Sequence, residues 1–309
     1  MANALKILSI AEDFSLYFTM SIFVVGTIGN LLNLGILTSL KIFRGNQCAF
    51  YLIVESITNT CQLTVLFIIN LLPIILGFEP GNVYSAWCKL KNMLPQTLRL
   101  ISTSMVCFAA FDQYLSTNPN PLIRRLSTLR LAHRLTFVAV CLWTLHSIPY
   151  GIFYGISSSN VCTFNNTKLT HYYSYFYYPI LHGFFPILFS SLLSLFAYHN
   201  VRHLVRLQVT VVRRRLDRQL TAMIFVRVIF FILFLLPYTI YRIYSLSVTF
   251  TKANLYPYAV NQVVYSVMTA TNNFNYIVRF LFIFYVKLNE NLFVLGEFLY
   301  LYCNIISIS

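Results

Sequence analysis

Residues 87–115 read WCKLKNMLPQTLRLISTSMVCFAAFDQYL, a largely apolar run with a cysteine near its start and an Asp-Gln-Tyr triplet near its end. Asp112 follows Cys88 by 24 positions, which corresponds to ~36 Å of α-helix at a rise of ~1.5 Å per residue. A helix of this length crosses the hydrocarbon core of a bilayer. The stretch therefore predicts a membrane-spanning helix with Cys88 at one interface and Asp112 at the other.

The composition of the whole chain supports a protein embedded in a lipid bilayer. Of the 309 residues, 58% are hydrophobic and 10% are charged, whereas a soluble domain has about 25% charged residues. The mean hydropathy is +0.69. Too few charged side chains remain to cover a globule of this length, so we expect apolar side chains to face lipid.

Seven segments are long and apolar enough to span the membrane as helices, which pair all their backbone groups internally. They predict an all-α membrane protein, a seven-transmembrane helix bundle that forms a single domain over residues 1–309. The segments are 14–40, 50–76, 87–115, 131–156, 172–199, 220–246 and 255–285.

The net charge of +14 is explained by membrane topology, so no nucleic-acid partner is expected. If the N-terminus lies outside, the three internal loops carry twelve Lys and Arg residues and the external side carries five. Basic residues favour the cytoplasmic side. The bias predicts an external N-terminus, an internal C-terminus and a multi-pass protein of the plasma membrane.

The external segments hold a predicted disulfide and a predicted glycosylation site. Of the seven cysteines, Cys88 and Cys162 fall in external positions, and a bond between them would pin the loop after the fourth span over the bundle. Asn165 begins an Asn-Asn-Thr acceptor sequence in the same loop, which makes the chain a candidate glycoprotein.

Ionisable side chains within the spans are costly and usually face the bundle interior. In the external half, Arg99 and Arg242 together with Gln96 and His182 predict a cavity for a ligand with a carboxylate or phosphate group. For Arg242 an alternative stays open, in which its side chain extends to lipid headgroups.

A second group of ionisable residues lies in the internal half. Glu55 of the second span is at a depth similar to that of Arg227 and Arg279 in the last two spans. Because an unpaired buried charge is costly, we expect Glu55 to pair with one of these two arginines. The sequence leaves open which of them it is.

The order and spacing of several motifs resemble those of the rhodopsin-like, or class A, G-protein-coupled receptor family over nearly the whole chain. The chain looks like a divergent, invertebrate chemoreceptor-like member. The matching features are Gly29-Asn30, Cys88 with Cys162, Asp112-Gln113-Tyr114, Trp143, Pro186, Phe231 and Pro237. The resemblance implies a receptor that binds an extracellular ligand and signals through a heterotrimeric G protein. It also implies switch roles for Asp112, Gln113, Tyr114, Asp217 and Pro237.

Several switch positions depart from the family pattern. Gln113 stands where the family has arginine, Leu235 stands where it has tryptophan, and the Asn-Pro-x-x-Tyr motif is missing. Asp217 is placed either to face Gln113 or to pair with neighbouring arginines. The leading hypothesis is a receptor that signals through a G protein. Two alternatives stay open: a receptor fold without G-protein coupling, and a small polytopic transporter or channel.

Catalytic chemistry is not expected. The sequence has no phosphate-binding glycine loop, and its six histidines lack the spacing of a metal site on one helix face. We therefore predict that the chain is not an enzyme and needs no cofactor or metal.

Overall fold

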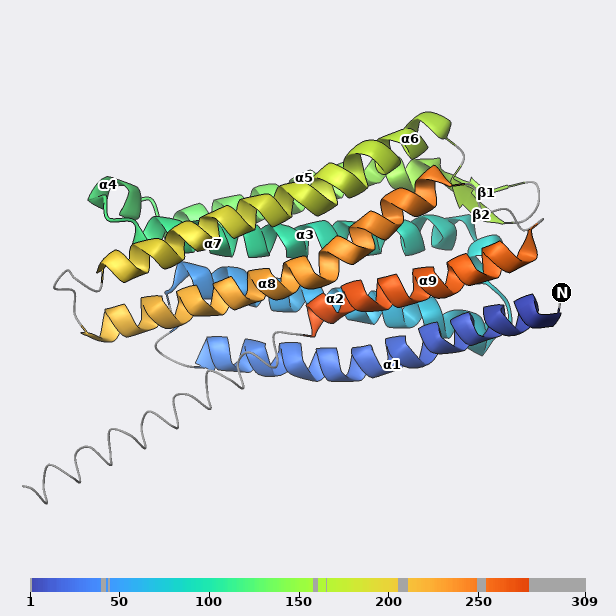
Figure 1. Ribbon diagram of the computed structural model, residues 1–309, viewed down its shortest axis with the longest axis horizontal. Coiled ribbons are helices and arrows are strands. Elements are labelled where there is room, and N and C mark those ends of the chain that lie inside the picture. The colour runs from blue at the N-terminus through green and yellow to red at the C-terminus, as the bar shows by residue number, and fades with distance from the viewer. Residues whose placement is uncertain are drawn as a thin grey trace, which may run out of the picture.

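The computed structural model describes residues 2–39, 43, 45–157, 161–164, 166–204, 211–248 and 254–277, with the side chains of residues 2, 202–204, 211–220 and 246–247 outside that description. Long helices run side by side along the length of the molecule (Figure 1). The long helices are α1 (Ala2–Ser39), α2 (Gln47–Leu76), α3 (Ser85–Thr117), α5 (Leu129–Phe153), α7 (Phe185–Leu204), α8 (Val211–Ser247) and α9 (Leu255–Asn273).

Shorter elements connect the long helices. They are the 3₁₀ turns η2 (Pro80–Asn82) and η4 (Phe274–Tyr276), the helices α4 (Pro121–Arg124) and α6 (Thr167–Tyr172), the π-helix η3 (Tyr173–Phe184), and the strands β1 (Tyr154–Ile156) and β2 (Cys162–Phe164). Elements α6, η3 and α7 follow one another without a break, so they form one continuous helical rod.

Each of the seven predicted segments overlaps a helix in the described residues, and residues 278–285 of the seventh lie outside them. The fourth segment ends earlier than expected. Helix α5 stops at Phe153 because the backbone of Tyr154 is extended. Residues Tyr154–Ile156 instead pair with Cys162–Phe164 in an antiparallel hairpin, with Tyr154 opposite Phe164. The hairpin satisfies backbone groups that a longer helix would have paired internally.

Five of the described helical segments are long and apolar enough to cross a membrane. Helices α3 and α9 are not among these five. Helix α3 carries Lys89, Lys91, Arg99 and Asp112, and it packs against α2, α5, α7 and α8. A helix enclosed by others needs less apolar surface than one facing lipid. The fold is therefore that of a helical membrane-type protein.

Side-chain caps begin several of these helices. The side chain of Asn46 accepts a hydrogen bond from the Ala49 N–H at 3.0 Å before α2, and Thr128 accepts one from Leu131 at 3.3 Å before α5. Helix α2 ends at Gly77, whose φ of 71° lies in the left-handed region that glycine adopts at least cost.

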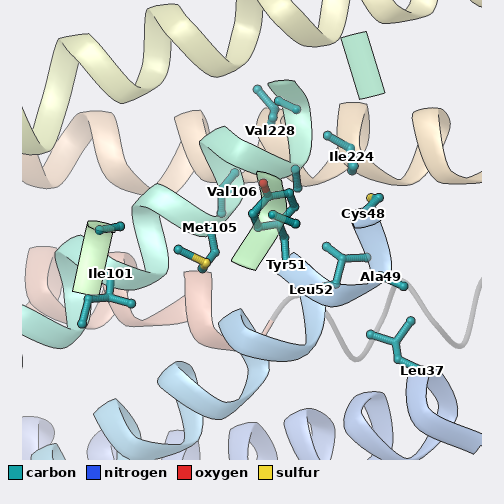
Figure 2. Close-up of a cluster of buried hydrophobic side chains, with 14 residues drawn as sticks. Leu37, Cys48, Ala49, Tyr51, Leu52, Ile101, Met105, Val106, Ile224 and Val228 are labelled. Atoms are coloured by element: carbon teal, nitrogen blue, oxygen red, sulfur yellow. The ribbon is translucent and has the colours of Figure 1, made fainter. Parts of the chain in front are cut away.

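The largest apolar cluster lies among α2, α3, α5 and α8, and Figure 2 shows part of it around Tyr51. Tyr51 is 2% exposed and belongs to this cluster together with Met105 and Val106 of α3 and Ile224 and Val228 of α8. This packing joins α2, α3 and α8, the three helices that carry the buried polar contacts described below.

The two ends of the bundle differ. The N-terminus, β1 and β2 lie at one end, which we name the hairpin end, and α4 lies at the opposite end, which we name the α4 end (Figure 1). At the hairpin end a disulfide joins Cys88 to Cys162, the pair predicted from the sequence. The Cys162 N–H also donates to the side chain of Asn82 at 3.1 Å. The hairpin is thus tied to the start of α3.

The π-helix η3 approaches α8 closely at Gly183. A Cβ at this position would lie 2.6 Å from the Thr239 Cγ2 and 2.8 Å from the Tyr178 carbonyl oxygen. Both distances are shorter than a normal van der Waals contact. Glycine at this position therefore permits the packing of η3 on α8.

We expect Gly183→Ala to destabilise the fold by ~1–3 kcal/mol, the usual cost of overpacking a core. Gly35→Ala is the matched control, because no atom lies within 4 Å of a Cβ built there and alanine favours a helix by ~0.5–1 kcal/mol. Thermal unfolding of both variants in detergent measures the difference. Equal unfolding temperatures for the two variants would show that the close approach at Gly183 is wrong.

Candidate functional site

Two arginines from different helices meet a group of tyrosines toward the hairpin end. Arg99 of α3 donates from Nη1 to the Tyr238 hydroxyl at 2.9 Å. Arg242 of α8 donates from Nη2 to the Tyr178 hydroxyl at 2.9 Å, and its guanidinium lies 4.6 Å from the centre of that ring. We name Tyr173, Tyr177, Tyr178 and Tyr238 the tyrosine cluster; all four are at most 8% exposed.

Neither arginine forms a salt bridge with a carboxylate in the described part of the chain. The ion pairs found there are Lys91 with Glu79 and Arg227 with Glu55. The Nε–H groups of Arg99 and Arg242 are both buried and lack a hydrogen-bond acceptor. Tyrosine hydroxyls accept hydrogen bonds from these cations but do not offset their charge.

Gln96 and His182, the other two predicted ligand-binding residues, lie in the same place. Gln96 donates to the Tyr173 hydroxyl at 3.3 Å. The His182 side chain is 0% exposed, stacks against Tyr177 and lies edge-on to Tyr238, with centroid distances of 6.0 Å in both cases. Neither ring nitrogen of His182 has a hydrogen-bond partner. All four predicted residues therefore converge on the tyrosine cluster.

Two further tyrosines lie where α5 passes into the hairpin, Tyr150 in the helix and Tyr154 at the start of β1. The Tyr150 hydroxyl donates to the Tyr154 hydroxyl at 3.3 Å, and the Tyr150 ring packs edge-on against Tyr173 at 4.6 Å. Burial raises the pKa of the Tyr154 phenol, so this group is neutral at physiological pH. The surroundings of the two arginines are thus rich in tyrosine hydroxyl groups.

A buried ion pair occupies the middle of the bundle. Arg227 donates from Nη2 to Glu55 at 3.0 Å and from Nε to the same oxygen at 3.3 Å, and its Nη1 donates to Asn275 at 3.3 Å. Glu55 is 0% exposed and Arg227 is 7% exposed. The structure thus pairs Glu55 with Arg227, one of the two predicted partners, whereas Arg279 lies outside the described residues. These bonds join α2, α8 and η4.

The Asp-Gln-Tyr triplet lies toward the α4 end. The Gln113 side chain is 2% exposed and accepts a hydrogen bond from the Thr221 hydroxyl of α8 at 3.0 Å. Asp112 accepts from the Ser127 hydroxyl at 2.7 Å, and Tyr114 packs against Phe196 of α7. Gln113 therefore makes a neutral link between α3 and α8.

Of three other predicted residues, the structure describes Pro237 fully but not the Asp217 side chain or Asn165. Pro237 lies inside α8, between Arg227 and Arg242, where its missing N–H removes one helical hydrogen bond. The side chain of Asp217 and the whole of Asn165 lie outside the described residues. The predicted partner of Asp217 and the predicted glycosylation site therefore stay predictions.

Sequence reasoning missed the tyrosine cluster and the π-helix. Residues 172–178 include five tyrosines, but aromatic residues are 17% of the whole chain, so this run was not recognised as a site. The useful signal was the presence of two arginines in facing spans, which need nearby hydrogen-bond acceptors. π-Helical turns are often found at functional sites. No residue pattern in the sequence predicted this one.

Comparison with protein-family models and with curated proteins finds no match for this chain.

We expect loss of either member of the buried pair to be strongly destabilising. Glu55→Gln or Arg227→Gln should cost ~3–5 kcal/mol, because the remaining charge is buried without its partner. Glu79→Gln at the partly exposed Lys91–Glu79 bridge should cost at most ~1 kcal/mol. Thermal unfolding in detergent and surface expression measure both effects.

The exchanged pair Glu55→Arg with Arg227→Glu tests whether the two charges act on each other. Partial recovery of expression relative to each single reversal is expected. If the double variant is expressed no better than the worse of the two single variants, the result would contradict direct pairing of Glu55 with Arg227.

Proposed function

We propose that this chain is a plasma-membrane receptor that binds an extracellular ligand carrying an acidic group and signals through a heterotrimeric G protein. The observation that carries the proposal is the pair Arg99 and Arg242, two cations among tyrosine hydroxyls with no carboxylate partner in the described residues. A carboxylate or phosphate would supply the missing charge and accept from the two free Nε–H groups.

The proposal includes seven membrane-spanning helices with the hairpin end outside. Five helices qualify by length and hydropathy, and the seven-span reading adds α3 and α9, which lie within the same bundle (Figure 1). The lysine and arginine bias supports the orientation, because α4 and its neighbouring arginines lie at the opposite end from the N-terminus. The bilayer, the external ligand and the G protein are the proposed partners.

Helix α8 supplies a physical route between the ligand and the G protein. It carries Arg242 and Tyr238 near the tyrosine cluster, Arg227 at the ion pair, and Thr221 at Gln113. Thr221 and Arg242 are ~32 Å apart along the helix. A ligand that draws Arg242 toward its acidic group would bias the position of α8, and a shift of its Thr221 end would break the link to α3.

Gln113 favours a second candidate, a receptor of the same fold that does not couple to a G protein. In the family that the motifs resemble, the corresponding arginine contacts the G protein. Here the residue is neutral, and its side-chain oxygen accepts a hydrogen bond from Thr221. Gln113→Arg tests this candidate: nucleotide exchange that appears only in this variant would favour it over coupling by the native chain.

The ligand class is tested by comparing acidic compounds with their neutral amides or esters. Cells expressing the chain are screened with fatty acids, aromatic acids, nucleotides and acidic peptides, and exchange of guanine nucleotide on a set of Gα proteins is measured. We expect activation by an acid and at least a tenfold loss for its neutral analogue, since charge-assisted hydrogen bonds contribute ~1.5–3 kcal/mol each.

Arg242→Gln should cause a similar loss of potency for that acid, whereas Lys91→Gln should not, because Lys91 is a partly buried cation already paired with Glu79. Equal responses to acid and amide would refute the acidic ligand. No response from any compound with any Gα would count against signalling.

The link between Gln113 and Thr221 predicts basal activity in its absence. Thr221→Val keeps the side-chain shape and removes the hydroxyl that donates to Gln113. Loss of this bond should favour the shifted position of α8 by ~0.5–1.5 kcal/mol, a roughly twofold to tenfold rise in basal nucleotide exchange. Thr38→Val is the control, because that exposed hydroxyl bonds only within α1. Unchanged basal exchange in Thr221→Val would argue that the link does not restrain α8.

A further inference from the structure

A narrow internal cavity lies beside Arg99, among α3, η3, α8 and the residues around η4. Its polar lining includes Arg99, Ser102, Thr103, His182, Arg227 and Asn272, while Arg242 is not part of it. The free space fits about one particle of the size of a water molecule. A large ligand does not fit such a space, but a single small ion or water does.

The charge of the cavity lining is positive. Two guanidinium groups, those of Arg99 and Arg227, contribute to it. Glu55 offsets Arg227, but no described carboxylate pairs with Arg99. One positive charge therefore remains at the cavity, and in a surrounding of low dielectric constant an unpaired charge is costly.

The residues that line the cavity also carry hydrogen-bond donors without acceptors. The Arg99 Nε–H and the Asn272 Nδ2 are buried and unpaired. His182 is fully buried with both ring nitrogens unpaired, and a neutral imidazole has one N–H to donate. A water molecule would accept from some of these groups but would leave the charge of Arg99 uncompensated. A small anion would do both.

We propose that this cavity is a binding site for one chloride ion or a similar small monovalent anion, held by Arg99, His182 and Asn272. This site and the proposed ligand site share Arg99 and His182, but they would bind different species, a small inorganic anion and an acidic ligand. Both occupants would accept from the Arg99 Nε–H, so the anion and the acidic ligand would compete for it. The tests of the anion site need no ligand and no G protein, so failure of this proposal is distinguishable from failure of the receptor proposal.

The first test uses the full chain purified in detergent without ligand. Sodium chloride replaces sodium gluconate at constant sodium concentration and ionic strength while the thermal unfolding temperature is followed. We expect a saturable rise of a few degrees with chloride and with bromide, and equilibrium binding of radioactive chloride at about one ion per chain. No bound chloride, or a rise that never saturates and so reflects a general salt effect, would overturn the proposal and leave water as the occupant.

Variants separate an anion site from a merely structural role. Arg99→Gln should abolish chloride binding, whereas Lys91→Gln, which removes a cation that is paired with Glu79 and does not line the cavity, should retain it. Asn272→Asp places a carboxylate in the lining and should raise the unfolding temperature in gluconate while removing the response to chloride. If Arg99→Gln does not fold, Asn272→Asp and radioactive chloride binding by the native chain still decide the question. An Asn272→Asp variant that responds to chloride as the native chain does would contradict the site.

Discussion

The pairing of Glu55 with Arg227 holds a charge of each sign inside an apolar bundle, and the arrangement of the interior depends on it. Each ion alone would cost several kcal/mol to bury. The pair removes most of that cost only because α2 and α8 bring the two side chains within 3.0 Å, with Asn275 of η4 as a further partner for the guanidinium. The relative position of these three elements is therefore set by electrostatics as well as by the apolar contacts of Tyr51 and its neighbours (Figure 2).

The two arginines toward the hairpin end are stabilised differently from Arg227. Arg99 and Arg242 are accommodated by tyrosine hydroxyls and rings, which offer hydrogen bonds and cation–π contacts but no charge. A structure selected for stability alone would place apolar side chains or a complete ion pair at these positions. Incomplete compensation of buried charge is typical of sites that receive a charged partner. The same reasoning applies to His182, whose fully buried ring has no hydrogen-bond partner although hydroxyl-bearing side chains surround it.

The sequence predicted the parts of this structure that depend on bulk hydrophobicity and on charge. Long apolar runs located all the long helices, because a backbone surrounded by lipid has few alternatives to a helix. Because burying an unpaired charge is costly, the sequence also predicted that Glu55 pairs with one of two arginines, Arg227 or Arg279. The sequence did not predict the three-residue strands, since so short a segment carries no periodicity. Nor did it predict the π-helix, for which no distinguishing residue pattern was found. It also missed Tyr178 and Tyr238 as arginine partners, because aromatic residues are common throughout this chain.

Helix α8 is held unequally along its length, and this inequality determines how it can move. Near its middle, Arg227 is bound to a carboxylate whose loss is worth ~3–5 kcal/mol. Toward the α4 end, Thr221 is bound to Gln113 by one neutral hydrogen bond, worth ~0.5–1.5 kcal/mol. Pro237, between Arg227 and Arg242, interrupts the helical hydrogen bonds. The least costly motion of α8 therefore keeps the ion pair intact as a pivot and separates α8 from α3 at Gln113, and the proline gives the segment that carries Arg242 freedom to bend as it does so.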